Sequence, residues 1–156
     1  MTCTDNMPNS SPNILAMIWF YQCALTIFRC ELTNRNTGAE AVETGIKLAR
    51  RWGYMKKGIP AGQAIVFSVQ GNFHGRTTGV VSMSTDPESR DQHGPYLPLV
   101  GAKDPTTGKV IRYNHIDDLQ ESFERHSANI AGLIIEPIQG EAGYCLPSLV
   151  FKLTVF

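Results

Sequence analysis

Asn-Thr-Gly-Ala-Glu-Ala-Val-Glu-Thr-Gly-Ile-Lys-Leu-Ala-Arg-Arg-Trp at residues 36–52 and Ile-Ala-Gly-Leu-Ile-Ile-Glu-Pro-Ile-Gln-Gly-Glu-Ala-Gly at residues 130–143 decide the fold of this chain. The first stretch has helical apolar spacing over 39–52, with acidic residues early and basic residues late, as the helix dipole favours. The second begins with an apolar run that is typical of a strand buried on both faces, and residues 64–69 form another. Alternating strands and helices predict an α/β fold with a mainly parallel sheet.

Length and composition allow one domain with a real core. The chain has 156 residues, of which 42% are hydrophobic, and its fourteen basic residues balance its fourteen acidic ones. This balance gives no reason to expect a nucleic-acid partner or an anionic membrane surface. The cysteines at positions 3, 23, 30 and 145 form no CxxC pair, which argues against a disulfide framework or a zinc site and favours free thiols in a reducing compartment.

An apolar run at residues 14–28 is interrupted by Gln22. It is shorter than the roughly 20 residues of a membrane span, and no Lys or Arg precedes it as in a signal peptide. We interpret it as a buried helix or as a segment whose sequence is wrongly specified, with a membrane anchor as the alternative. A cytoplasmic location is therefore expected, and a mitochondrial one is left open.

The chain divides into three zones: a partly disordered segment 1–35, an α/β zone 36–147 and an apolar tail 148–156 with β-propensity. Within the α/β zone, 75–84 is expected to contain a short helix and 85–109 a long loop rich in Pro, Gly and Asp. Residues 110–113 are a candidate strand. Residues 117–126 are expected to form a helix with Asp117 as its N-cap.

Thr37-Gly38-Ala39 opens the first predicted helix. Amides in a first helical turn have no intrahelical partner, and the dipole favours an anion there, so this turn is a candidate phosphate site. Thr37 and Glu40 also have the spacing of a capping box. The alternative is an ordinary helix start, because the Glu40 carboxylate disfavours an anion unless it turns back into the cap.

Two further segments carry side chains suited to binding. Phe73 lies in a glycine-flanked loop after a buried strand, where its ring could stack on a planar heterocycle, and Arg76 could clamp a carboxylate. The alternatives are a core phenylalanine and a surface arginine. Glu136 directly follows an apolar run, where a carboxylate needs a partner, and Glu141 lies five residues further on.

Three stretches of the sequence, in their order along the chain, resemble the large domain of class III, pyridoxal-phosphate-dependent aminotransferases: residues 36–41, 71–76 and 136–143. Residues 41–54 and 57–60 are similar to the ornithine aminotransferases in particular. The resemblance implies the α/β large domain of the aspartate-aminotransferase type, with pyridoxal 5′-phosphate (PLP) as cofactor. It covers residues 36–147.

The resemblance also implies roles for particular residues. The cofactor-binding candidates are Thr37, Gly38 and Ala39 for the phosphate, Phe73 stacked on the pyridine ring, His74 beside it, and Glu136 close to the cofactor. The substrate-binding candidates are Arg76, for the substrate α-carboxylate, and Glu141, which in the family pairs with a second arginine that this chain does not contain.

In the family, an aspartate for the pyridine nitrogen and the Schiff-base lysine follow the matching stretch, and neither motif is present here. No catalytic residue is therefore assigned, and we expect an inactive piece of a longer enzyme that moves the δ-amino group of ornithine to 2-oxoglutarate. The alternatives are an acetylornithine or 4-aminobutyrate enzyme of the same class, or a non-catalytic fragment acting by interaction. The implied partners are an amino acid and a 2-oxo acid. The family is homodimeric, but we do not expect this part to dimerise alone.

Overall fold

A computed structural model describes residues 17–18, 25–28, 31–34 and 36–155 of the chain. Its main sheet has four strands in the order β1-β6-β4-β5, where β1 is Met17–Ile18, β6 is Ile130–Ile134, β4 is Ile65–Phe67 and β5 is Val100–Gly101. All three pairings are parallel. The predicted α/β fold with a mainly parallel sheet is therefore confirmed.

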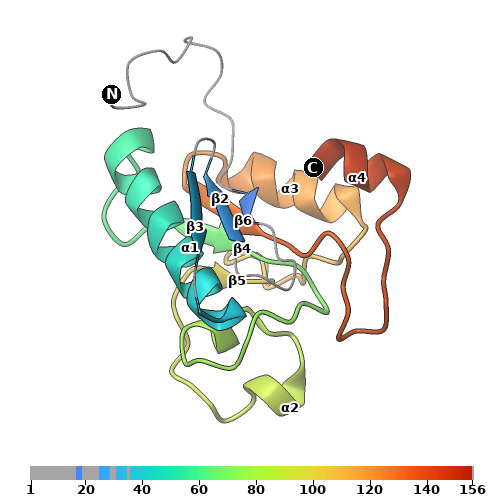
Figure 1. Ribbon diagram of the computed structural model, residues 1–156. Helices are drawn as coiled ribbons and strands as arrows, with labels where there is room; N and C mark the ends of the chain where they lie inside the picture. The colour runs from blue at the N-terminus through green and yellow to red at the C-terminus, as the bar shows by residue number, and fades with distance from the viewer. Residues whose placement is uncertain (1–16, 19–24, 29–30, 35, 156) are drawn as a thin grey trace.

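Helices cover both faces of this sheet (Figure 1). Helix α1, Gly38–Trp52, packs through Val42, Ile46 and Ala49 on one face, against residues that include Val66 and Ile134. Helix α3, Ile116–His126, and helix α4, Leu149–Val155, lie on the other face. Their buried side chains Leu119 and Phe151 pack with a second set of strand residues that includes Ile65, Phe67 and Leu133. Alternation along the strands supplies a core to each face.

Short elements complete the chain. A π-helical turn η1, Gly53–Lys57, extends α1 and ends at the left-handed residue Gly58. The 3₁₀ turn η2 is Val80–Met83 and helix α2 is Pro87–Arg90. The hairpin of β2, Leu25–Phe28, and β3, Glu31–Asn34, is antiparallel and separate from the main sheet.

Several local expectations are wrong. Within the segment 14–28, expected as a buried helix, the described residues 17–18 and 25–28 are strands, because they pair with β6 and β3; the remainder lies outside the described residues. The expected loop 85–109 contains α2 and the edge strand β5. The candidate strand 110–113 makes only an isolated bridge between Val110 and Lys103.

Two corrections concern the later helices. Asp117 is not the N-cap of α3: His115 holds that position, and Asp117 lies in the first turn, where its charge suits the helix dipole. The tail 148–156, expected to favour β structure, forms α4 over Leu149–Val155. Burying Phe151 beside Tyr113, with ring centroids 5.4 Å apart, favours the helix over the local β-propensity.

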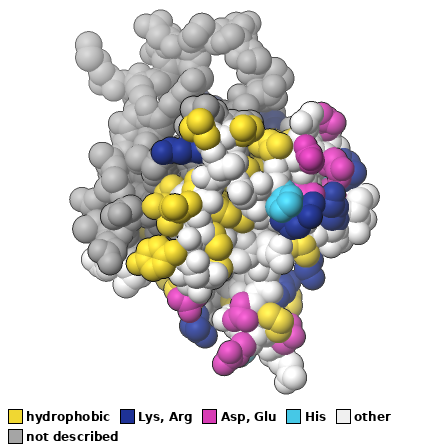
Figure 2. Space-filling model, turned by 90° about the vertical axis from the view of Figure 1, so that its right-hand side faces the viewer, with side chains coloured by type: hydrophobic (Ala, Val, Ile, Leu, Met, Phe, Trp, Pro, Cys, Tyr) yellow, Lys and Arg dark blue, Asp and Glu magenta, His cyan; other side chains and the backbone are white. Residues whose placement is uncertain are grey.

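The face carrying the C-terminal segment exposes apolar side chains. Figure 2 shows hydrophobic groups gathered over much of this face, next to acidic and basic side chains. Tyr144, Leu146 and Leu149 are each at least 66% exposed. Strand β6 itself is an inner strand between β1 and β4, so its backbone is paired on both sides.

Candidate functional site

The N-terminus of α1 is closed by a capping box. The Thr37 Oγ1 atom accepts a hydrogen bond from the Glu40 amide at 3.2 Å, and the Glu40 carboxylate accepts one from the Asn36 amide at 3.0 Å. Glu40 therefore turns back toward residue 36. This orientation meets the condition under which the Gly38 and Ala39 amides can serve an anion.

The loop after β4 lies directly against this helix start. Gly75 has φ +117°, and a Cβ atom placed on it would lie 2.8 Å from the Ala39 Cβ atom. No side chain fits in that gap, and the φ value itself is costly for any residue but glycine. The sequence-predicted motifs at 37–39 and 73–76 thus come side by side in the structure.

Phe73 and Arg76 are presented together on this loop. Phe73 is 41% exposed, which excludes the interpretation as a core phenylalanine. The Arg76 guanidinium carbon lies 5.8 Å from the centre of the Phe73 ring, within the range of a cation–π contact. An aromatic ring and a cation therefore lie next to the N-terminus of α1.

Glu136 follows β6 and reaches the same loop. Its Oε2 atom accepts a hydrogen bond from the Phe73 amide at 3.1 Å, and its side chain is largely buried. Burial raises the pKa of Glu136 to about 7, and the charge of Glu141 acts in the same direction, while the Phe73 amide opposes it. This carboxyl group is thus poised to gain or lose a proton near neutral pH.

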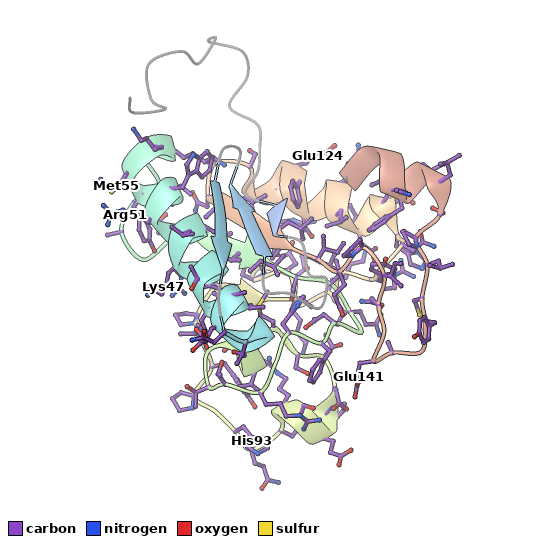
Figure 3. The ribbon with its side chains drawn as sticks, in the orientation of Figure 1. Lys47, Arg51, Met55, His93, Glu124 and Glu141 are labelled. Atoms are coloured by element: carbon purple, nitrogen blue, oxygen red, sulfur yellow. The ribbon has the colours of Figure 1, made fainter. Side chains whose placement is uncertain are left out.

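Glu141 lies in a loop whose ends are joined by paired backbone hydrogen bonds between Gln139 and Cys145, of 3.1 and 2.9 Å. Its side chain is exposed, and Figure 3 shows it on the loop that follows β6. Its effect on the Glu136 pKa places it within electrostatic range of that group. The described residues hold no arginine hydrogen-bonded to it.

Sequence reasoning missed the residues that anchor this loop. The buried Gln139 side chain donates a hydrogen bond to the Gln70 carbonyl at 2.8 Å, and the Tyr113 hydroxyl donates one to the Pro137 carbonyl at 3.1 Å. Burial, with the nearby Glu136, raises the pKa of Tyr113 to about 12, so it stays a donor. For Gln139, the sequence offered one indication, a side-chain amide placed between Pro137 and two glycines. Nothing in the sequence around Tyr113 indicated its role.

Comparison with known proteins identifies the lineage. The family model described as aminotransferase class-III matches residues 20–155. The chain belongs to the class-III aminotransferase family. This match extends beyond both ends of the stretch 36–147, whose limits as a separate zone stay a prediction.

Individual relatives agree with this assignment. The chain is 56% identical over 112 residues to the ornithine aminotransferase of Emericella nidulans, covering 72% of this chain and 25% of that protein. The ornithine aminotransferase structure from Toxoplasma gondii is 35% identical with a TM-score of 0.66, covering 75% and 25%. The acetylornithine aminotransferase structure from Elizabethkingia anophelis is 43% identical with a TM-score of 0.53, again covering 75% and 25%. The chain thus spans about a quarter of their length.

The geometry of the site can be compared with the chemistry of PLP, which carries a phosphate group on a planar heterocycle. PLP is present at partial occupancy in the active site of the Toxoplasma gondii structure. Here the turned-back Glu40 leaves the α1 terminus suited to a phosphate, and the exposed ring of Phe73 is suited to a heterocycle. The close approach of Gly75 to Ala39 brings both features to one place.

His74 has a different position from its neighbour Phe73. It is only 5% exposed, and burial lowers its pKa to about 4, so the ring is neutral at pH 7. The structure therefore presents Phe73, and not His74, to the surface of the site. A direct role of His74 toward the cofactor stays a prediction.

Two lysines, Lys57 and Lys109, make contacts away from the candidate site, and a third, Lys47, is exposed on α1. The Lys57 ammonium donates to the Ile130 carbonyl at 2.8 Å, and burial lowers its pKa. Lys109 pairs with Asp118 and Glu121. Lys47 lies on the outer side of α1, away from the sheet (Figure 3). That none of the lysines in this sequence carries the cofactor stays a prediction.

Two further findings bear on other functions. In the described part of the chain, no helix is long and apolar enough to cross a membrane. Among the same residues, no group of three or more His, Cys, Asp or Glu side chains could hold a metal ion.

Proposed function

We propose that this chain forms the cofactor- and substrate-contacting part of an ornithine aminotransferase-like, PLP-dependent transaminase. Family membership and the juxtaposition of three segments distant in the sequence support the proposal. The observation that carries it is the meeting of the α1 terminus, the Phe73–Arg76 loop and Glu136, through the Gly75–Ala39 approach and the 3.1 Å Phe73–Glu136 hydrogen bond. When bound, PLP supplies the electron sink for amino-group transfer.

Each residue has a defined task in this proposal. The Thr37-Gly38-Ala39 turn holds the phosphate, and Phe73 covers one face of the ring. Glu136, with a pKa of about 7, holds or releases a proton beside the cofactor. Arg76 binds the α-carboxylate of the amino acid or 2-oxo acid, because a guanidinium forms strong charge-assisted hydrogen bonds with a carboxylate. The assembled enzyme is a homodimer in this proposal.

Cofactor binding can be tested without any lysine chemistry. Pyridoxamine 5′-phosphate has no aldehyde, so its titration into the 156-residue chain, followed by NMR, reports non-covalent binding alone. We expect shifts at the Gly38 and Ala39 amides, and Phe73→Leu should weaken binding about tenfold, since aromatic stacking contributes about 1–3 kcal/mol. Inorganic phosphate should compete. Binding that leaves these amides and the Phe73 variant unaffected would overturn the assigned site.

Covalent attachment is a separate question. We expect incubation with PLP followed by borohydride to label no single lysine stoichiometrically, because the family's lysine motif is not in this sequence. Peptide mapping by mass spectrometry measures this directly. Specific labelling at one lysine would contradict the expectation.

Substrate choice is tested in a chimera in which the remaining part of the Emericella nidulans enzyme is joined to residues 36–147. Arg76→Ala should lower kcat/KM about 30- to 150-fold for ornithine and for 2-oxoglutarate alike, equivalent to losing about 2–3 kcal/mol. Glu141→Gln should instead favour α-amino donors such as glutamate over ornithine. Equal damage by both variants to both half-reactions would refute these two roles.

The second candidate is an acetylornithine-type enzyme, favoured by the 43% identity to the Elizabethkingia anophelis protein. The same chimera separates the two, because ornithine and acetylornithine can be compared as donors. A preference for acetylornithine in the unmodified chimera would select this alternative.

A further inference from the structure

Glu43, in the second turn of α1, contacts the loop that carries Arg76. Its carboxylate accepts a hydrogen bond from the Thr77 hydroxyl. The two residues are 34 positions apart in the sequence, so this bond ties the loop after β4 to the helix. Glu43 is half-buried, whereas Thr77 and Arg76 are exposed.

The backbone of the loop packs closely around this bond. A Cβ atom placed on Gly79 would lie 2.6 Å from both oxygens of the Glu43 carboxylate. Gly75 meets Ala39 in the same way, at 2.8 Å. Because Ala39 and Glu43 are four residues apart, both contacts lie on one face of α1. The loop is thus seated on that face at two points, on either side of Arg76.

Thr77 also accepts hydrogen bonds from the turn η2. Its hydroxyl oxygen accepts a hydrogen bond from the Val80 amide at 3.4 Å, and its carbonyl accepts one from the Val81 amide at 2.9 Å. Val80 and Val81 belong to η2 and are buried. Thr77 therefore joins α1 to a buried turn, and the backbone of its neighbour Arg76 has little freedom to move.

From this geometry we propose that Glu43 is a positioning residue that acts through Thr77 to set where Arg76 presents its guanidinium. The inference rests on the proposed function in one respect, namely that Arg76 receives a substrate carboxylate. Glu43 itself does not contact the substrate. Removing its hydrogen bond releases the 75–79 loop and lets Arg76 sample positions that do not bind a carboxylate.

The first experiment measures the loop without any ligand, in the full 156-residue chain. Amide hydrogen exchange at Val80 and Val81 should accelerate about fivefold in Glu43→Ala and Thr77→Val, as expected for one net hydrogen bond lost. Glu43→Gln and Thr77→Ser keep an acceptor and a hydroxyl, so both should exchange as the parent does. Glu124→Ala, on the exposed side of α3 (Figure 3), is the matched control and should change nothing.

The second experiment asks whether Glu43 acts through Arg76. With 2-oxoglutarate as the probe, Glu43→Ala should raise Kd about fivefold. The Glu43→Gln variant keeps the acceptor and should have the Kd of the parent chain. In an Arg76→Ala background, Glu43→Ala should have no further effect. A purely structural role would lower the unfolding midpoint and leave this coupling absent.

The outcomes separate this inference from the proposed function. Unchanged exchange in Glu43→Ala, or a full additional loss of affinity on top of Arg76→Ala, overturns the positioning role. If the parent chain does not bind 2-oxoglutarate while the exchange pattern holds, the carboxylate role of Arg76 is overturned and the anchoring of its loop by Glu43 is supported.

Discussion

Two regions of the molecule, the contact between the loop 103–112 and α3 and the candidate site at the end of β6, contain buried carboxylates with opposite properties. On the α3 side, Asp118 is 2% exposed and receives two hydrogen bonds from the Arg112 guanidinium, of 2.6 and 3.0 Å, with Lys109 at 2.9 Å. These partners, Arg112 above all, hold the pKa of Asp118 well below its usual range. In the candidate site, Glu136 has one backbone donor at 3.1 Å, and its burial raises the pKa to about 7.

Asp104 extends the comparison. Burial acts to raise its pKa, but the Thr106 and Thr107 amides, His126 and Arg125 together hold it well below the usual range. Asp104 and Asp118 therefore fix the loop 103–112 on α3 as permanent anions. Glu136 is left short of partners at the carboxyl ends of β4 and β6, where ligands of open α/β sheets bind. The number of hydrogen-bond donors around a buried carboxyl group, more than the extent of its burial, therefore decides whether its pKa falls or rises. A carboxyl group with many donors is a structural anchor, and one with few donors can exchange a proton near neutral pH.

The largest expected effect comes from removing an anchor. Asp118→Ala should lower the free energy of unfolding at pH 7 by about 3 kcal/mol, the low end for breaking a buried pair, because Arg112 and Lys109 are about half exposed and can be hydrated. Urea denaturation measures it, with Glu124→Ala as a control that should change stability by less than about 0.5 kcal/mol. A loss for Asp118→Ala below about 1 kcal/mol would break the comparison.

Glu136→Gln is expected to raise the free energy of unfolding, whereas Asp118→Ala lowers it. A folded pKa of about 7 means that the stability contributed by protonated Glu136 is complete below the unfolded value of 4.5 and is lost as pH rises through 7. The amide keeps an acceptor for the Phe73 N–H and has no charge to bury. The variant should gain about 2 kcal/mol at pH 8 and nothing at pH 4. Destabilisation at pH 8 would place Glu136 among the anchors.

A smaller effect is expected in the free energy of unfolding as the pH falls from neutral into the acid range. Burial lowers the His74 pKa to about 4 from 6.5, so its stabilising contribution is present above pH 6.5 and is lost as pH falls toward 4. Glu136 works in the opposite direction over this window, so the parent should be nearly flat from pH 6.5 to 5. Glu136→Gln should lose about 1 kcal/mol over that interval. Parallel profiles of parent and variant would contradict the opposing roles.

The smallest effect is expected at the surface. Lys109 and Glu121 are 47% and 53% exposed, so their 2.9 Å ion pair is largely screened. Glu121→Gln should shift the urea midpoint less than any change above, and 0.5 M NaCl should remove even that shift. A salt-resistant loss would mean that Glu121 belongs to the Asp118 anchor.

Elements with strong local patterns could be predicted from the sequence. The helix expected at 39–52 is Gly38–Trp52, and the helix expected at 117–126 is Ile116–His126. The apolar run that begins the stretch 130–143 is the strand Ile130–Ile134. Elements of two residues, such as β1 and β5, could not, because they exist only through pairing with β6 and β4. The same holds for α4, which is favoured by the burial of Phe151.

The fold class, the family and the chemical groups available to a site could be inferred from the sequence alone: a helix N-terminus, an aromatic ring in a loop, a guanidinium and two glutamates. These follow from local periodicity and from short motifs, within each of which the residues lie only a few positions apart. Only the tertiary structure decided that Gly75 meets Ala39, that Phe73 contacts Glu136 and that Glu43 holds Thr77. Such contacts join residues 34 to 63 positions apart, and they arise because parallel strands bring the ends of separate segments to one edge of the sheet.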